Sequence, residues 1–107
     1  MTREGELEAV RQQGKRLRTG HLEIRHIASL LPHSRAGVIV PRYSHGAVER
    51  NRVKRQVREI VRLDVLPALG GVDVLVRALP SAYQATYAEL REECRQARNR
   101  ITGETER

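Results

Sequence analysis

The stretch AVERNRVKRQVRE, residues 47–59, combines a helical hydrophobic pattern with a dense run of basic side chains. Together with the residues that follow, its apolar members recur at positions i, i+4, i+7 and i+8, the spacing of one helix face: Val53, Val57, Ile60 and Val61. Pro67 and the glycine pair at 70–71 break the chain after this pattern. The sequence therefore predicts a helix over residues 48–63, with one side packed against the rest of the protein.

The polar side of this predicted helix is cationic. At about 100° per residue, an arc beside the apolar face collects Asn51, Lys54, Arg55, Arg58 and Arg62. Arg50 and Arg52 fall outside the arc but lie in the first turns, where a long side chain can reach a ligand past the helix end. A solvated helix face is the ordinary explanation of a charge run. Here the few nearby acidic residues cannot neutralise the adjacent like charges, so the pattern favours an anion supplied from outside.

The composition of the whole chain indicates one folded domain with a polyanionic partner. The 107 residues are 39% hydrophobic and 31% charged, which suits a single compact domain over residues 1–107. Lys and Arg total 20 against 13 Asp and Glu, a net charge of +7, so a polyanion is the expected partner. Neither a signal peptide nor a membrane span is recognisable, and the single Cys94 fits a reducing compartment, so we expect a cytoplasmic protein without membrane contact.

The remaining elements follow from hydrophobic periodicity and turn residues. The pattern predicts a short first helix, a hairpin of two strands, a very apolar and therefore central strand, and a last helix: residues 4–13, residues 21–28 with 35–40, residues 72–79, and a helix that begins at residue 81. Ser81 and Gln84 have the spacing of a capping box. The order α-β-β-α-β-α predicts an α+β fold in which helices pack on a small mixed sheet, with residues 1–3 and 103–107 frayed.

Several residues that invite a functional assignment have a simpler explanation. An apolar stripe in the last helix contains Tyr83, Tyr87 and Cys94, which we expect in the core. The histidines are scattered without acidic partners at metal-site spacing, so the sequence predicts no metal bound by the protein. His45 is the exception to test, because it lies beside the arginine-rich helix.

At residues 47–59 the pattern also resembles a known signature. The run Ala-Val-x-Arg-Asn-x-x-Lys-Arg-x-x-Arg-Glu is similar to that of the bacterial ribonuclease P protein family. The layout around it is similar too, with a strand ending Val38-Ile39-Val40-Pro41-Arg42 before it, an apolar strand after it and a tyrosine-bearing last helix. The resemblance covers nearly the whole chain.

This resemblance implies a fold and a function. The fold would be that of one domain of a small-subunit ribosomal protein. Its βαβ crossover would be left-handed, whereas such crossovers are almost always right-handed. The chain would be the non-catalytic protein subunit of ribonuclease P, in which a catalytic RNA removes the 5′ leader from precursor tRNA. Magnesium would be held by the RNA and not by the protein, and one protein would bind each RNA.

The resemblance also assigns residues to the RNA. Those implied to dock on the catalytic RNA are Arg50, Asn51, Arg52, Lys54, Arg55 and Arg58. Arg62 lies on the same arc, and Arg42 and Tyr43 stand just before the helix, so we add these three to the predicted RNA-binding set.

A second implied site is a cleft between the first helix and the sheet that holds the 5′ leader. Family members commonly carry phenylalanines there, whereas this chain contains no Phe. Leu7 and Arg11 occupy those places, and Arg25, facing away from its strand's apolar side, would join them.

Two other function classes remain open at this point. A structural RNA-binding protein, such as a ribosomal protein, would show the same basicity. A self-sufficient nuclease is the weaker alternative, because the sequence offers no carboxylate cluster to hold catalytic metals and no catalytic residue is assigned.

Overall fold

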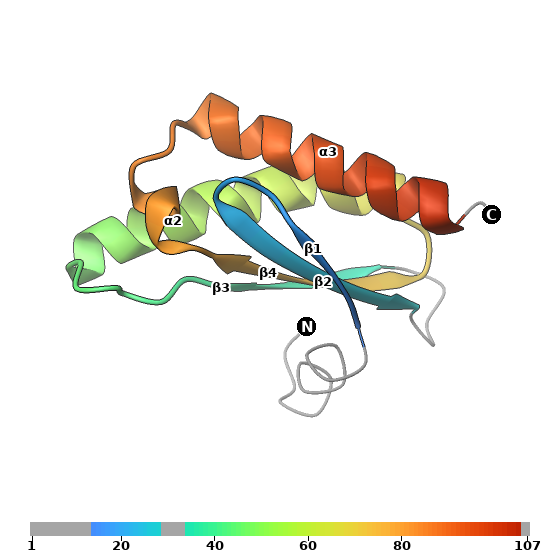
Figure 1. The fold of residues 1–107 in the computed structure, drawn as a ribbon, viewed down its shortest axis with the longest axis horizontal. Helices are drawn as coiled ribbons and strands as arrows, with labels where there is room; N and C mark the ends of the chain where they lie inside the picture. The colour runs from blue at the N-terminus through green and yellow to red at the C-terminus, as the bar shows by residue number, and fades with distance from the viewer. Residues whose placement is uncertain (1–13, 29–33, 106–107) are drawn as a thin grey trace.

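The computed structural model describes residues 14–28 and 34–105, which form a four-stranded mixed sheet with two helices on one of its sides (Figure 1). The strands and helices are β1 (Lys15–Arg18), β2 (Leu22–Ala28), β3 (Arg35–Ile39), α2 (Ala47–Ile60), β4 (Val72–Ala78) and α3 (Tyr87–Thr105). The predicted first helix, with Leu7 and Arg11, lies outside the described residues. The α+β class is confirmed.

The strand order corrects one prediction. The sheet runs β1-β2-β4-β3, with β2 antiparallel to both β1 and β4 and with β3 parallel to β4. The predicted hairpin of residues 21–28 with 35–40 is therefore wrong, because β4 lies between the two strands. β4 is the most apolar strand and is buried along nearly its whole length, so a central position covers it on both edges. That central position was predicted and is confirmed.

β1 was not predicted at all. Its sequence KRLR has one apolar residue, Leu17, which is too little for a period-two pattern. Leu17 lies opposite Ile24 of β2, and both side chains are buried in the core. This pairing turns Arg16 and Arg18 to the other face of the sheet.

α2 connects the parallel strands β3 and β4, as a βαβ crossover must. Its helical course continues beyond the predicted end at residue 63, through a π-helical turn (Val61–Val65) and a 3-10 turn (Leu66–Ala68). The wider π turn keeps Val61 and Val65 both buried.

One core lies between the sheet and the two helices. α2 contributes Val53, Val57 and Ile60, as predicted from the spacing of its apolar residues. α3 contributes the predicted stripe, whose buried members are Leu90, Cys94, Ala97 and Ile101. Burial raises the pKa of the Cys94 thiol to about 12, so it stays protonated and packs as a small hydrophobe.

The start of α3 also differs from the prediction. The capping box is Thr86 with Glu89, not Ser81 with Gln84: the Glu89 amide donates to Thr86 Oγ1 at 3.1 Å, and the Thr86 amide donates to Glu89 Oε1 at 2.9 Å. The hydrogen bond from Thr86 lowers the pKa of Glu89. Ser81 lies in a 3-10 turn (Pro80–Tyr83) before the helix. α3 continues to Thr105, past residue 103, where the sequence predicts fraying.

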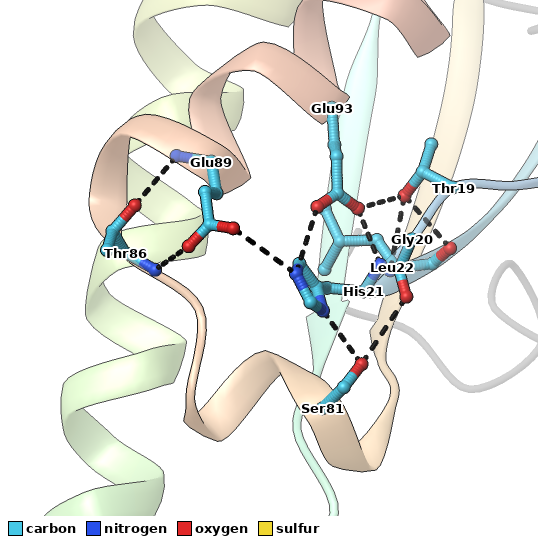
Figure 2. Close-up of polar contacts among 8 residues, drawn as sticks. All are labelled: Thr19, Gly20, His21, Leu22, Ser81, Thr86, Glu89 and Glu93. Carbon is cyan, nitrogen blue, oxygen red and sulfur yellow. Dashed lines mark hydrogen bonds and ion pairs between the residues drawn. The ribbon is translucent and has the colours of Figure 1, made fainter.

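Ser81 belongs instead to a polar cluster that joins the β1–β2 turn to α3 (Figure 2). Its hydroxyl lies 2.8 Å from His21 Nδ1, while the His21 amide donates to Glu93 Oε1 at 2.6 Å. The Thr19 hydroxyl donates to the same Glu93 oxygen at 2.5 Å. Glu93 therefore satisfies two donors of the turn, and His21 has the structural role expected of an isolated histidine.

Candidate nucleic-acid interface

The cationic arc of α2 faces away from the core, as the helix periodicity predicts. Asn51, Arg55, Arg58 and Arg62 are exposed and Lys54 is half-buried. Within residues 14–28 and 34–105, the side chains of these five residues form no hydrogen bond or ion pair. We call these five residues the basic arc; their charged and amide groups are available to a ligand.

The basic arc lines a groove between α2 and the edge strand β3. The groove has a volume of about 690 Å³. Ala36 and Val38 of β3 with Val61 and Leu66 form its apolar floor, and the basic arc and Glu59 complete its lining. The arrangement offers an apolar surface beside phosphate-binding donors, which is a combination suited to nucleotides.

Arg50 and Arg52 have partners inside the protein. Arg50 Nε donates to the Val40 carbonyl at 2.8 Å, and Arg52 Nη2 donates to the Tyr83 carbonyl at 3.3 Å. These bonds tie the start of α2 to the end of β3 and to the turn before α3. A guanidinium carries five N–H donors, so each side chain keeps donors that a phosphate could use. Their contact with RNA stays a prediction.

Tyr43 has a packing role in the turn that precedes α2. Its hydroxyl donates to the Ala78 carbonyl at 3.0 Å, and its ring meets Tyr83 edge-on at a centroid distance of 6.4 Å. Tyr43 and Ser44 have positive φ angles of 46° and 72°, which a residue with a side chain rarely adopts without such support. The predicted RNA contact of Tyr43 is untested, while Arg42 beside it is exposed.

His45 stacks on the ring of Tyr83 in this aromatic group. Its ring lies parallel to that of Tyr83, with the centroids 3.9 Å apart and the planes at 5°. His45 Nδ1 is 2.7 Å from Glu49 Oε2, and this hydrogen bond lowers the pKa of the Glu49 carboxyl. Tyr83 is buried and donates to the Pro41 carbonyl at 2.6 Å, which confirms its predicted place in the core. His45 thus contacts both Glu49 in the first turn of α2 and Tyr83 in the turn before α3.

The face of the sheet opposite α2 and α3 carries a second group of arginines. Arg25 of β2 lies there, in a hollow of about 330 Å³ lined by Glu23, Arg25, Ile39, Leu75 and Arg77. The register places Arg16 opposite Arg25 and Arg18 opposite Glu23. We call Arg16, Arg18, Arg25 and Arg77 the sheet-face arginines. Of these four, only Arg25 was predicted from the sequence, because the others depend on β1 and on the strand order.

The charges on this face are only partly paired. Arg25 Nε lies 3.3 Å from Glu23 Oε1. In the part of the chain that the structure describes, Arg16, Arg18 and Arg77 make no ion pair. The face is therefore electropositive around the hollow and offers a second place for a polyanion.

The described residues lack two further kinds of feature, a metal-binding cluster and a membrane-spanning helix. Within them, no group of three or more His, Cys, Asp or Glu side chains is arranged to hold a metal ion. No helix among them is both long enough and apolar enough to span a membrane.

Comparison with known proteins identifies the family. The family model described as "Ribonuclease P" matches residues 1–102. The ribonuclease P protein component of Acidothermus cellulolyticus is 37% identical over 95% of this chain and 87% of its own length, and that of Syntrophobacter fumaroxidans is 37% identical over 78% and 71%. The RNase P protein of Thermotoga maritima superposes with a TM-score of 0.79 at 24% identity, covering 89% of this chain and 90% of its own. A chain with this sequence match and this fold belongs to the ribonuclease P protein component family, which acts in tRNA processing within a ribonucleoprotein, and not to the ribosomal proteins.

Proposed function

We propose that this chain is the non-catalytic subunit of ribonuclease P, binding the catalytic RNA through the basic arc and the 5′ leader of precursor tRNA through the sheet-face arginines. The family implies partnership with the RNase P RNA. The observation that carries the proposal is the basic arc, whose exposed side chains have no partner among the described residues. Phosphates of a docked RNA would supply the missing counter-charges.

The chemistry of the arc supports a role in binding and not in the cleavage itself. Guanidinium and ammonium groups donate hydrogen bonds to phosphates but do not coordinate metal ions. Hydrolysis of a phosphodiester at a tRNA end needs a positioned metal-bound hydroxide, which we assign to the RNA with its magnesium ions. Neutralising phosphates would also help the RNA to compact around those ions.

The leader-binding part of the proposal rests on the sheet face. Arg25, Arg77 and the buried side chain of Leu75 lie around one hollow there, and β1 extends the positive charge with Arg16 and Arg18. An extended single strand can lay its phosphates along such a row. By holding leader and catalytic RNA together, one protein per RNA would raise the affinity for precursor over mature tRNA.

A binding competition tests this proposal. The purified chain is titrated with a bacterial RNase P RNA and with ribosomal RNA fragments of matched length, at several salt concentrations. We expect tighter binding to the RNase P RNA, and a complex of the two that binds precursor tRNA more tightly than mature tRNA. Tighter binding of the chain to the ribosomal fragments would favour a structural RNA-binding protein. Equal affinity of the complex for precursor and mature tRNA would show that the protein does not bind the leader.

A further inference from the structure

We infer that the groove between α2 and β3 holds one unpaired nucleotide of the RNase P RNA, with its base on the apolar floor and its phosphate on the basic arc. The inference rests on the proposed function and deepens it, because it names the kind of RNA element that docks. It concerns the floor of the groove, a surface that phosphate binding alone does not need.

The floor is apolar, and the core supports it from behind. Ala36, Val38 and Leu66 are partly buried and pack directly against the core, and Val61 is itself a core residue with 2% of its surface exposed. Such a floor cannot bend away from a ligand without disturbing the core. It therefore presents a fixed apolar patch to the face of a base.

The size and openness of the groove favour a single unpaired nucleotide over a double helix. The volume of about 690 Å³ falls within the range of roughly 300–1,000 Å³ that is usual for small-molecule sites. A double helix keeps its bases stacked inside and presents mainly backbone to a protein, whereas an unpaired base can leave the stack and lie on an apolar surface. Only the unpaired base would use both the floor and the charged rim.

The rim has the matching polar chemistry. Lys54 and Arg58 lie one turn apart, about 6 Å along the helix axis, so they can grip the phosphate of a base that lies on the floor. The Asn51 side chain lines the same groove, and its amide has no hydrogen bond among the described residues. An amide offers one donor and one acceptor to a base edge, a pattern that adenine matches best.

The test fills the floor without removing any positive charge. Ala36→Phe is made in the full chain, and Ala88→Phe is its matched control, because Ala88 is exposed on α3. Each protein is bound to an RNase P RNA transcript, and unpaired bases are probed with dimethyl sulfate for adenine and cytosine and with a carbodiimide for guanine and uracil. Affinity is measured over a salt series.

We expect the unaltered chain and Ala88→Phe to protect one unpaired base, with adenine favoured. Ala36→Phe should lose this protection and bind roughly tenfold more weakly, because its ring fills the space above the floor and excludes the base from the groove. Its salt dependence should be unchanged, because no phosphate contact is removed. Val38→Thr, which keeps the size of the floor but adds a hydroxyl, is the second variant; it should weaken both affinity and protection to a smaller extent.

The outcomes separate the inference from the proposed function. Tight binding of the RNase P RNA with no protected base would overturn the inference and leave the proposed function standing. Failure of the unaltered chain to prefer RNase P RNA would sink the proposed function itself. A melting curve shows whether Ala36→Phe folds; if it does not, Val38→Thr decides, and unchanged affinity and protection in that variant would contradict the inference.

Discussion

At the start of α2, Arg50 and Arg52 donate hydrogen bonds to backbone carbonyls of the protein. Further along, Arg55 and Arg58 of α2 and Arg62 of the π-helical turn after it have no side-chain partner among the described residues. The two groups share residue type, but only in the second are all the side-chain donors unused within the described residues. The difference teaches that the arginine-rich run combines two roles. Its first part anchors the helix, and its second part offers the charges.

The largest effect should come from the buried side of this helix, which both groups depend on. Val57→Ala is expected to lower the free energy of unfolding by about 1–3 kcal/mol, because the lost methyl groups leave a cavity in the core. Urea denaturation measures the change. Val57→Ala should still bind RNA phosphates under conditions where the variant is folded. An unchanged free energy of unfolding would show that Val57 does not lie on the buried face of the helix.

The anchoring role of Arg50 predicts a smaller loss of stability. Arg50→Ala removes the donor of a part-buried hydrogen bond to the Val40 carbonyl, which water can partly replace, and should cost about 0.5–1.5 kcal/mol. Arg55→Ala is the matched control on the same helix and should stay within about 0.5 kcal/mol of the unaltered protein. Equal stability of the two variants, measured by urea denaturation, would erase the distinction between the two groups.

The ligand-binding role of the second group predicts an effect on RNA affinity alone. Arg55→Ala or Arg58→Ala should weaken RNA binding without unfolding the domain, and should flatten the slope of log affinity against log salt by roughly 0.7–0.9 for each lost phosphate contact. Filter binding over a salt series measures both quantities. Unchanged affinity and an unchanged salt slope in both variants would show that Arg55 and Arg58 of the basic arc do not contact the RNA.

The residues proposed to bind the leader should show the most selective effect. Arg77→Ala and Arg11→Ala are expected to lower affinity for precursor tRNA while hardly affecting mature tRNA or the bare RNA subunit, because only the precursor carries a leader. Leu7→Phe should strengthen leader binding and reduce its salt dependence by adding a ring on which a base can stack. If either arginine variant loses equal affinity for both tRNAs, that arginine lies outside the leader path.

The local patterns in the sequence predicted three of the four described strands, α2, the apolar stripe of α3 and the basic arc. The spacing of Val53 and Val57 predicted both the helix and its charged side, and the apolar run at residues 72–79 predicted a central strand. Long-range pairing was not predictable in this way: β2 and β3 follow each other in the chain, yet β4 separates them. Burial of the most apolar strand outweighed closeness in sequence.

Of the missed features, the cap of α3 is local: Ser81 and Thr86 both begin a possible capping box, and the structure uses Thr86, while Ser81 lies beside His21. The others depend on how the strands pair. The groove needs β3 beside α2, and the backbone partner of Arg50 lies at the end of that strand. Arg77 joins Arg25 only because β4 pairs with β2. No single segment carries the signals for the groove, for the Arg50 partner or for the place of Arg77.

Reconstitution tests the central claim most directly, that the chain assists an RNA catalyst by binding. The purified protein is added to a bacterial RNase P RNA at low magnesium, where cleavage by the RNA alone is slow, and release of the 5′ leader from precursor tRNA is followed over time. We predict that leader release rises with added protein and that the protein without the RNA releases none. No increase in the presence of the RNA, or cleavage by the protein on its own, would contradict the account.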